Sequence, residues 1–188
     1  MNPCAGFVFL LAPLAFAASA ATPTATPYAG QETRSIKSLS DDEISALLAG
    51  QGMGLAKAAE LNGYPGPAHV LELASELRLT SEQRAATEAL FVSMQSKAAK
   101  LGAALVDEER RLDQLFRERT VTGDSLAGEL SKIGALQAEV RGVHLEAHLA
   151  ELRILTPEQA AKYASLRGYA AHPADDGAAH HEHHIIRN

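Results

Sequence analysis

The sequence predicts an all-α protein organised around an elongated, antiparallel helical hairpin. Two long stretches place apolar residues three or four positions apart, a spacing typical of amphipathic helices. The break between them, Thr120 to Asp124, contains Gly123 and is short enough to make the two helices antiparallel neighbours. No stretch of useful length alternates β-branched with polar residues, so we expect no sheet.

The first long helix is expected from Ser81 to Glu118. Thr80 is positioned to cap it through its hydroxyl, and Gln83 to bond back to the Thr80 N–H. A helix of 38 residues would be about 57 Å long, so the hairpin should be elongated. Its apolar stripe is interrupted only by Glu108 and consists of Phe91, Met94, Ala98, Leu101, Leu105, Leu112 and Leu115.

The second long helix follows the break and is expected to end near Arg153. Its own apolar stripe supplies a partner for the first helix and consists of Leu126, Leu130, Ile133, Val140, Val143 and Ala147. The two stripes together are broader than one intramolecular contact covers, and an exposed apolar strip of that length is a liability. We therefore expect a homodimer.

The capping pattern of Thr80 and Gln83 returns 76 residues later at Thr156 and Gln159. Here Pro157 occupies the first helical position, where its missing N–H costs nothing. We interpret these threonine and glutamine side chains mainly as helix caps, each stabilising its helix by about 1 kcal/mol. Direct contact with a ligand or partner is the alternative.

Shorter segments flank the hairpin. The stretch from Ala21 to about Leu39 is rich in Thr, Pro, Ser and Gly and is interpreted as a disordered spacer. Ser40 opens another capping box, which starts a helix through about Ala49. Further short helices are expected over Leu55–Leu61, Pro67–Leu77 and Pro157–Leu166, with Gly168 stopping the last one. The predicted divisions are N-terminal helices and a turn over 40–67, a hairpin domain over 68–168 and a disordered tail over 171–188.

Residues 1–20 are interpreted as a signal peptide. The apolar run Phe7–Ala18 leads into small residues that suit cleavage after Ala20. An uncleaved anchor is the alternative, but Pro13 and the many alanines make this segment short and weakly apolar for a membrane span. Export would place the protein in the periplasm without a stable membrane anchor. Cleavage would also remove Cys4, the only cysteine, and leave no disulfide.

Charge and motif content argue against two classes of function. The formal net charge of −6 opposes binding to a phosphate backbone, so no nucleic-acid partner is expected. The sequence holds no nucleophile–base signature, no Gly-rich phosphate loop and no zinc-hydrolase motif. We therefore expect a protein that is not an enzyme and requires no cofactor.

Two Leu-Thr-x-x-Gln sequences, Leu79–Gln83 and Leu155–Gln159, flank the hairpin behind a secretory signal. In this respect the chain resembles the LTxxQ-motif periplasmic family, which includes Spy/CpxP-like chaperones and stress regulators and the related ZraP/CnrX heavy-metal-resistance proteins. The resemblance covers roughly residues 68–168. It implies a cradle-shaped antiparallel dimer of four helices, without enzymatic activity, that responds to stress or metals.

His144 and His148 lie four positions apart on the second long helix, so their imidazoles share one face. Because zinc prefers three or four ligands, further ligands would have to come from Glu151, His69 or a second protomer. This is one candidate metal site. The alternatives are two solvent-exposed histidines, or His144 at a contact within the hairpin.

The C-terminal tail is a second candidate metal-binding segment. Its imidazoles and carboxylates are those of His172, His180, His181, His183 and His184, with Asp175, Asp176 and Glu182. Neutral imidazole is a ready ligand for zinc, copper and nickel. A solvated tail that binds metals without selectivity is the alternative.

These observations support three functional hypotheses. The leading one is a Spy/CpxP-like, ATP-independent chaperone or envelope-stress modulator. Its partners would be unfolded or misfolded envelope proteins, or a sensor kinase. The second is a periplasmic metal-binding or heavy-metal-resistance protein that uses its histidines for zinc, copper or nickel. The third is a purely structural role.

Overall fold

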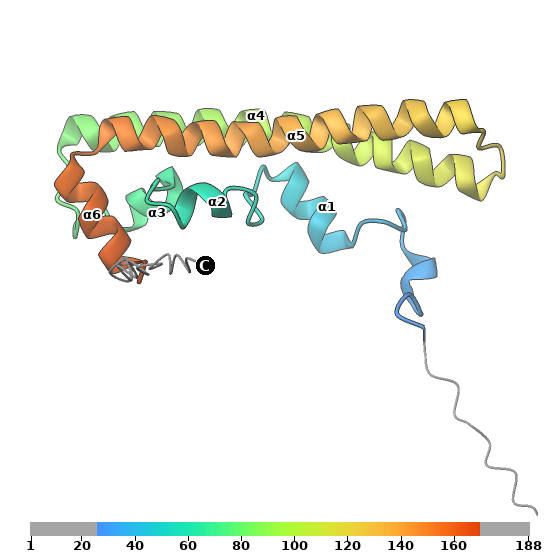
Figure 1. The fold of residues 1–188 in the computed structure, drawn as a ribbon, viewed down its shortest axis with the longest axis horizontal. Helices are drawn as coiled ribbons and strands as arrows, with labels where there is room; N and C mark the ends of the chain where they lie inside the picture. Colours follow the sequence, from blue (N-terminus) through green and yellow to red (C-terminus); the bar gives the residue numbers. More distant parts are fainter. Residues whose placement is uncertain (1–25, 170–188) are drawn as a thin grey trace, which may run out of the picture. The chain divides into compact units, whose positions relative to one another are not determined.

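The computed structural model describes residues 26–169, which form six α-helices and one 3-10 helix but no β-strand (Figure 1). The predicted all-α class is confirmed. The chain divides into two units, Met1–Glu32 and Thr33–Asn188. The described part of the first unit consists of a turn and the first two residues of η1 (Gln31–Thr33). No helix within the described range has both the length and the apolarity to cross a membrane.

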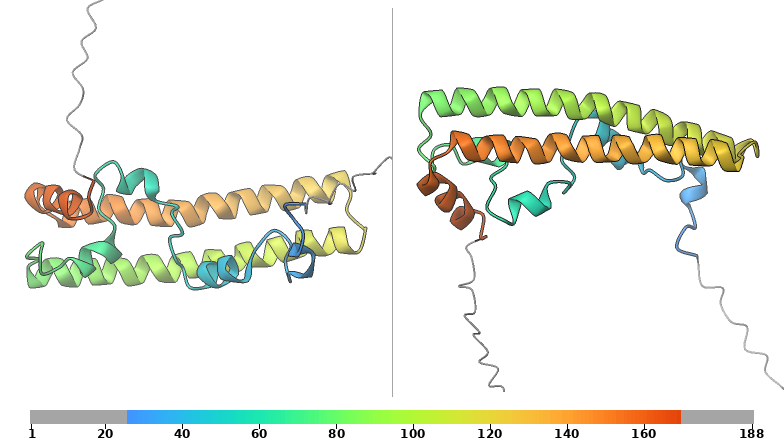
Figure 2. Two further views of the ribbon diagram at one scale, coloured as in Figure 1. Left: turned by 90° about the horizontal axis from the view of Figure 1, so that it is seen from below. Right: turned by 45° about the horizontal axis from the view of Figure 1, so that its top comes forward.

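The second unit is built on the predicted hairpin, formed by α4 (Ser81–Arg117) and α5 (Gly123–Ile154). These two helices lie side by side and antiparallel along their lengths (Figure 2). The 37 residues of α4 rise by about 56 Å, so the hairpin is elongated as expected.

The loop at the hairpin tip, residues 118–122, is as long as the predicted break from Thr120 to Asp124 but begins two residues earlier. Arg119 takes a left-handed conformation, with φ of 57°, and ends the first helix. Thr122 then caps α5, because its hydroxyl accepts a hydrogen bond from the Ser125 N–H at 3.2 Å. A capping box that uses Ser in place of Glu or Gln at its third position had not been recognised in the sequence.

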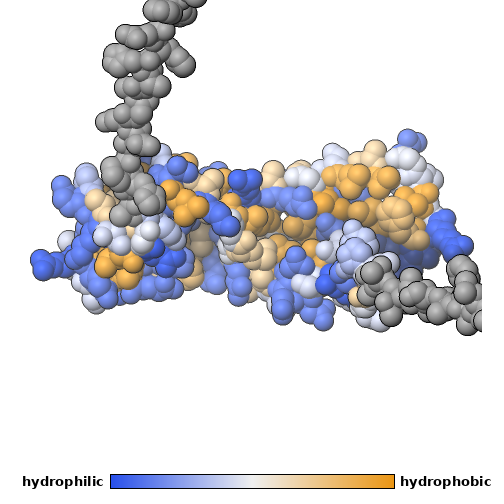
Figure 3. All heavy atoms as spheres, turned by 60° about the horizontal axis from the view of Figure 1, so that its bottom comes forward, coloured by the Kyte–Doolittle hydropathy of each residue, from blue (hydrophilic) through white to orange (hydrophobic). Residues whose placement is uncertain are grey.

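Four short helices share one side of the hairpin: α1 (Asp41–Leu48), α2 (Lys57–Glu60), α3 (Pro67–Glu72) and α6 (Pro157–Leu166). α1 and α3 pack on α4, while α2 packs on α5. Seen from this side, the molecule shows apolar surface between hydrophilic side chains (Figure 3). The short helices therefore cover the hairpin only in part.

Two of these helices are shorter than predicted. The expected helix Leu55–Leu61 keeps only its central residues, and Pro67–Leu77 ends at Glu72. Beyond Glu72 the chain forms turns, and Arg78 adopts a positive φ of 53°. The turns redirect the backbone so that Thr80 can cap α4, a requirement that overrides the helix propensity of the residues before it.

Two apolar clusters hold the short helices against the hairpin. The first joins α1 to the middle of the hairpin and contains Ile36, Leu47, Leu105, Val106 and Ile133. The second lies where the hairpin begins and ends, and contains Val70, Leu77, Leu155 and Tyr163. In the first cluster α1 approaches so closely that a Cβ on Gly102 would lie 2.2 Å from the Leu47 carbonyl oxygen. Only glycine fits at that position.

The predicted spacer from Ala21 to Leu39 is wrong for its last residues. Ile36 is only 1% exposed and belongs to the first cluster. The Lys37 N–H donates to Asp113 Oδ1 at 3.1 Å, and the Ser38 hydroxyl donates to Glu109 Oε2 at 2.7 Å. Ile36 and Leu39 are the only apolar residues among polar ones here. Two residues are too few to give a periodic signal, so this docking on α4 could not be predicted.

The predicted stripes face the core with one exception. Leu130 is 51% exposed, because the neighbouring Glu129 takes the inward position and pairs with Lys132 at 3.0 Å. Lys132 also lies 3.5 Å from Glu108 across the hairpin. The interruption of the first stripe at Glu108 is therefore a cross-helix ion pair.

Leu105 offers a test of this core. We expect Leu105→Asp to lower the free energy of unfolding by at least about 3 kcal/mol, because it buries an unpaired charge. The matched change at the exposed Leu130 should cost within about 0.5 kcal/mol. Denaturant unfolding followed by circular dichroism measures both. Equal effects of the two variants would contradict the assignment of Leu105 to the core.

Candidate functional site

Both Leu-Thr-x-x-Gln motifs form complete capping boxes, as predicted. The Thr80 hydroxyl accepts from the Gln83 backbone N–H at 3.1 Å, and the Gln83 side-chain oxygen accepts from the Thr80 N–H at 3.1 Å. At Thr156 and Gln159 the same two bonds measure 3.2 and 2.9 Å. The motifs are helix caps first.

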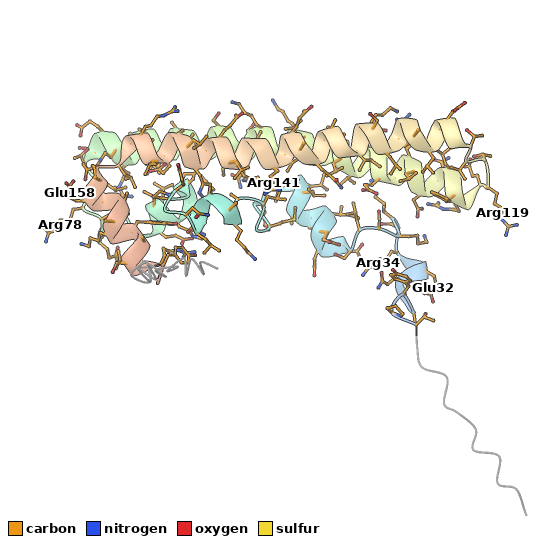
Figure 4. The ribbon with its side chains drawn as sticks, in the orientation of Figure 1. Glu32, Arg34, Arg78, Arg119, Arg141 and Glu158 are labelled. Carbon is orange, nitrogen blue, oxygen red and sulfur yellow. The ribbon has the colours of Figure 1, made fainter. Side chains whose placement is uncertain are left out.

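The two glutamine side chains also bond to each other. Gln83 Nε2 donates to Gln159 Oε1 at 2.8 Å, and Gln159 Nε2 donates to Gln83 Oε1 at 2.9 Å. The remaining N–H groups donate to the backbone oxygens of Ile154 and Leu77 at 2.9 and 3.2 Å. Every donor of both amides is therefore satisfied, and the starts of α4 and α6 are tied together. Arg78, which precedes the first motif, and Glu158, which lies within the second, mark this end of the hairpin in Figure 4.

Next to this junction, α6 reaches a polar group under the hairpin. Tyr163 is 1% exposed, and its hydroxyl donates to Glu60 Oε1 at 2.5 Å. Arg167 Nε lies 3.5 Å from the same carboxylate oxygen. Burial, and then the hydrogen bond to Glu60, raises the pKa of Tyr163 far above its usual range. The tyrosine is thus a fixed donor that orients Glu60.

His144 and His148 are both buried, with 3% and 9% exposed. Burial of both rings is consistent with the prediction that they share one face of the helix. The alternative of two solvent-exposed histidines is wrong. His148 Nδ1 donates to the Tyr64 carbonyl oxygen at 2.7 Å and lies 3.7 Å from Glu60 Oε2. Gly66 leaves room for the ring, because a Cβ there would lie 2.9 Å from His148 Cε1.

His144 has fewer hydrogen-bond partners than His148. Its Nε2 is buried and has no hydrogen-bond partner among the described residues. Burial, and then the charge of His148, lowers the pKa of His144. The ring is therefore held neutral with a free polar atom, which is costly unless something binds there.

The two histidines line a cavity of about 500 Å³ between the hairpin and the short helices. Apolar side chains of Phe91 and Leu61 contribute to its wall. The groups in its lining that can bind a metal ion are His69, His144, His148, Met53, Met94 and Glu60. Its size suits a small ligand or an ion with its ligands.

The further metal ligands expected in the sequence each have another partner through one of their polar atoms. Glu151 accepts a hydrogen bond from the Thr87 hydroxyl at 2.9 Å, and His69 Nδ1 lies 2.9 Å from Glu72 Oε2. In the described part of the chain, no three His, Cys, Asp or Glu side chains gather as a metal-ligand set. The tail histidines lie outside the described residues, as does the predicted signal peptide: His172, His180, His181, His183, His184 and residues 1–20.

A second cavity, of about 1070 Å³, lies between α1 and α5 and is called the groove below. Leu47, Leu55 and Leu145 supply apolar wall, and Arg141 supplies charge along the hairpin (Figure 4). Where α5 borders this groove it presents small residues, Gly134, Ala138 and Gly142. The groove is thus open, mixed in polarity and smooth along one side.

No protein-family model, curated protein or solved structure matches this chain. Its function is therefore inferred from the glutamine junction, the histidine cavity and the groove themselves.

The glutamine junction predicts energetic coupling. Gln83→Ala or Gln159→Ala alone should cost about 1–3 kcal/mol of unfolding free energy, because the partner amide loses a bond in a partly buried place. The double variant should cost less than the sum, with a coupling of at least about 0.5 kcal/mol. Pairing Gln83→Ala with the exposed Gln137→Ala gives the control cycle, which should be additive. Additivity in both cycles would contradict the junction.

The burial of Glu151 predicts that the free energy of unfolding depends on pH. Burial raises its pKa from 4.5 to about 7, and the Thr87 hydrogen bond only partly opposes this. As pH rises from 4.5 to 7, the unfolded chain releases this proton before the folded chain does, so stability falls. Relative to wild type, Glu151→Gln should therefore gain roughly 3 kcal/mol between pH 4.5 and 8. The exposed Glu146→Gln should show no such gain in denaturant unfolding, and a flat difference for both would refute the prediction.

Proposed function

We propose that this chain is an LTxxQ-type periplasmic protein that binds unfolded or misfolded envelope proteins without ATP and without catalysis. The observation that carries the proposal is the open groove between α1 and α5. Its apolar wall and scattered charges suit extended, partly apolar segments of many sequences. A homodimer, which would double this surface, is part of the proposal, and light scattering tests it.

The rigid hairpin supports this proposal. A holdase without nucleotide needs a binding surface that persists without a chemical cycle, and the capped, 37-residue helix α4 provides a long framework. Exposed apolar side chains on this framework include Val92 and Phe116, at 63% and 54%. Weak, distributed contacts of this kind favour transient capture over one tight complex.

Metal binding is the second candidate function, and one observation favours it. His144 Nε2 is a buried polar atom without a partner beside a cavity that also receives His148. An ion would satisfy this atom. Zinc titration of the full chain against His144→Ala tests this candidate separately from client binding.

The groove makes client binding testable with one pair of variants. Ala138 lines the groove and is exposed, whereas Ala135 is exposed on the same helix outside the groove lining. We expect Ala138→Glu to weaken suppression of the aggregation of a denatured client by severalfold, because a buried carboxylate opposes apolar contact. Ala135→Glu should suppress aggregation as wild type does. Light scattering of a thermally denatured client, without ATP, measures both.

Equal protection by the two variants would remove the groove as the binding surface. No protection by the wild-type chain would remove the chaperone proposal.

A further inference from the structure

We propose that the histidine cavity binds a soft monovalent metal ion, Cu(I) or its analogue Ag(I), through His144, His148 and the thioether of Met94. The inference deepens the second candidate function and rests on it. Its basis is that the potential nitrogen and sulfur ligands of the described residues meet in one place. Residues 26–169 contain three histidines and two methionines, and all five line this one cavity: His69, His144, His148, Met53 and Met94.

These five residues come from separate parts of the fold. Met94 lies on α4, His144 and His148 on α5, His69 on α3, and Met53 in the loop after α1. Sequence neighbourhood therefore does not explain why they meet. Folding places every imidazole and every thioether of the described residues around a single space.

The two helix histidines are prepared as ligands. His148 donates from Nδ1 to the Tyr64 carbonyl, which leaves its Nε2 lone pair available and fixes the ring. His144 has a buried Nε2 without a hydrogen-bond partner among the described residues. Neutral, oriented imidazole is the form that binds metals.

The ligand set favours a soft ion over zinc. Zinc sites take three or four nitrogen, oxygen or thiolate ligands, and the described residues hold no such group of three. Met94 is 9% exposed and lines the same cavity. Thioether sulfur selects Cu(I) among biological metal ions.

The charge of the lining also favours a monovalent ion. Glu60 Oε1 is engaged by Tyr163 and Arg167, while Glu60 Oε2 is buried without a hydrogen-bond partner and lies 3.7 Å from His148 Nδ1. The other ligands are neutral, so this one carboxylate, already shared with Arg167, is all that would compensate the two charges of a divalent ion in a mostly apolar place. A monovalent ion brings only one.

The test uses the full chain carrying Cys4→Ser, so that methionine supplies the only sulfur. Cu(I) is titrated anaerobically against a competing chromogenic chelator, and the copper X-ray absorption spectrum of the loaded protein is recorded. We expect one tightly bound Cu(I) with a sulfur scatterer. Met94→Leu, which conserves volume, should remove the sulfur signal and weaken Cu(I) binding at least about tenfold. His181→Gln in the tail is the control and should change neither.

Zinc titration separates this inference from the candidate function on which it rests. A Cu(I) spectrum with nitrogen ligands alone, or Met94→Leu with unchanged Cu(I) affinity, would overturn the soft site. If His144→Ala then still weakened zinc binding, metal binding by the histidines would stand. If His144→Ala changed neither Cu(I) nor zinc binding, both the soft site and the histidine candidate would be overturned.

Discussion

The paired amides of Gln83 and Gln159 connect the parts of this fold that are far apart in the sequence. Each glutamine completes the cap of its own helix and bonds to the other, so the capping boxes of α4 and α6 are also one tertiary contact. An amide has two donors, and here each donor has an acceptor in a partly buried place. Alternative packings of α6 would leave these groups unpaired, which costs more than the bonds gain.

From this junction, contacts lead directly to the cavity. The cap at Thr156 directs α6 so that Tyr163 enters the second apolar cluster and its hydroxyl reaches Glu60. Glu60 in turn lies next to His148, whose ring is held by Tyr64. The arrangement of the residues that line the histidine cavity therefore depends on the same amide pair that ties α6 to the start of α4.

Two buried polar side chains on α5 oppose stability in a way that suggests function. His144 and Glu151 both present buried polar atoms without partners, one on each side of His148 along α5. Protonation of His144 at low pH and ionisation of Glu151 near neutral pH each oppose folding. Leucine at these positions would fit the apolar stripe. Polar residues that weaken a fold are retained most often where a ligand uses them.

Periodicity and capping chemistry made the helices predictable. The stripes through Leu105 and Ile133 and the boxes at Thr80 and Thr156 depend on neighbours three or four residues away, which the sequence displays directly. Other features depend on tertiary partners. The docking of Ile36, the inward position of Glu129 and the bonding of Gln83 to Gln159 each require knowing what lies across the hairpin.

The candidate site was predictable to a similar extent. The spacing of His144 and His148 revealed a shared face, but not their burial. Met94 had been assigned to the apolar stripe alone, because a methionine at helical spacing gives no sign of which cavity it lines. The single available signal was that methionine and histidine are few in the described residues, and only the fold shows that they converge.

Hydrogen exchange in the Gln83→Ala variant tests most directly whether the amide pair organises the fold. The junction predicts faster amide exchange in two distant segments, residues 67–79 and 155–166, with the hairpin from 105 to 133 unchanged. Faster exchange confined to the first turn of α4 would show that Gln83 is only a local cap, and would contradict the account.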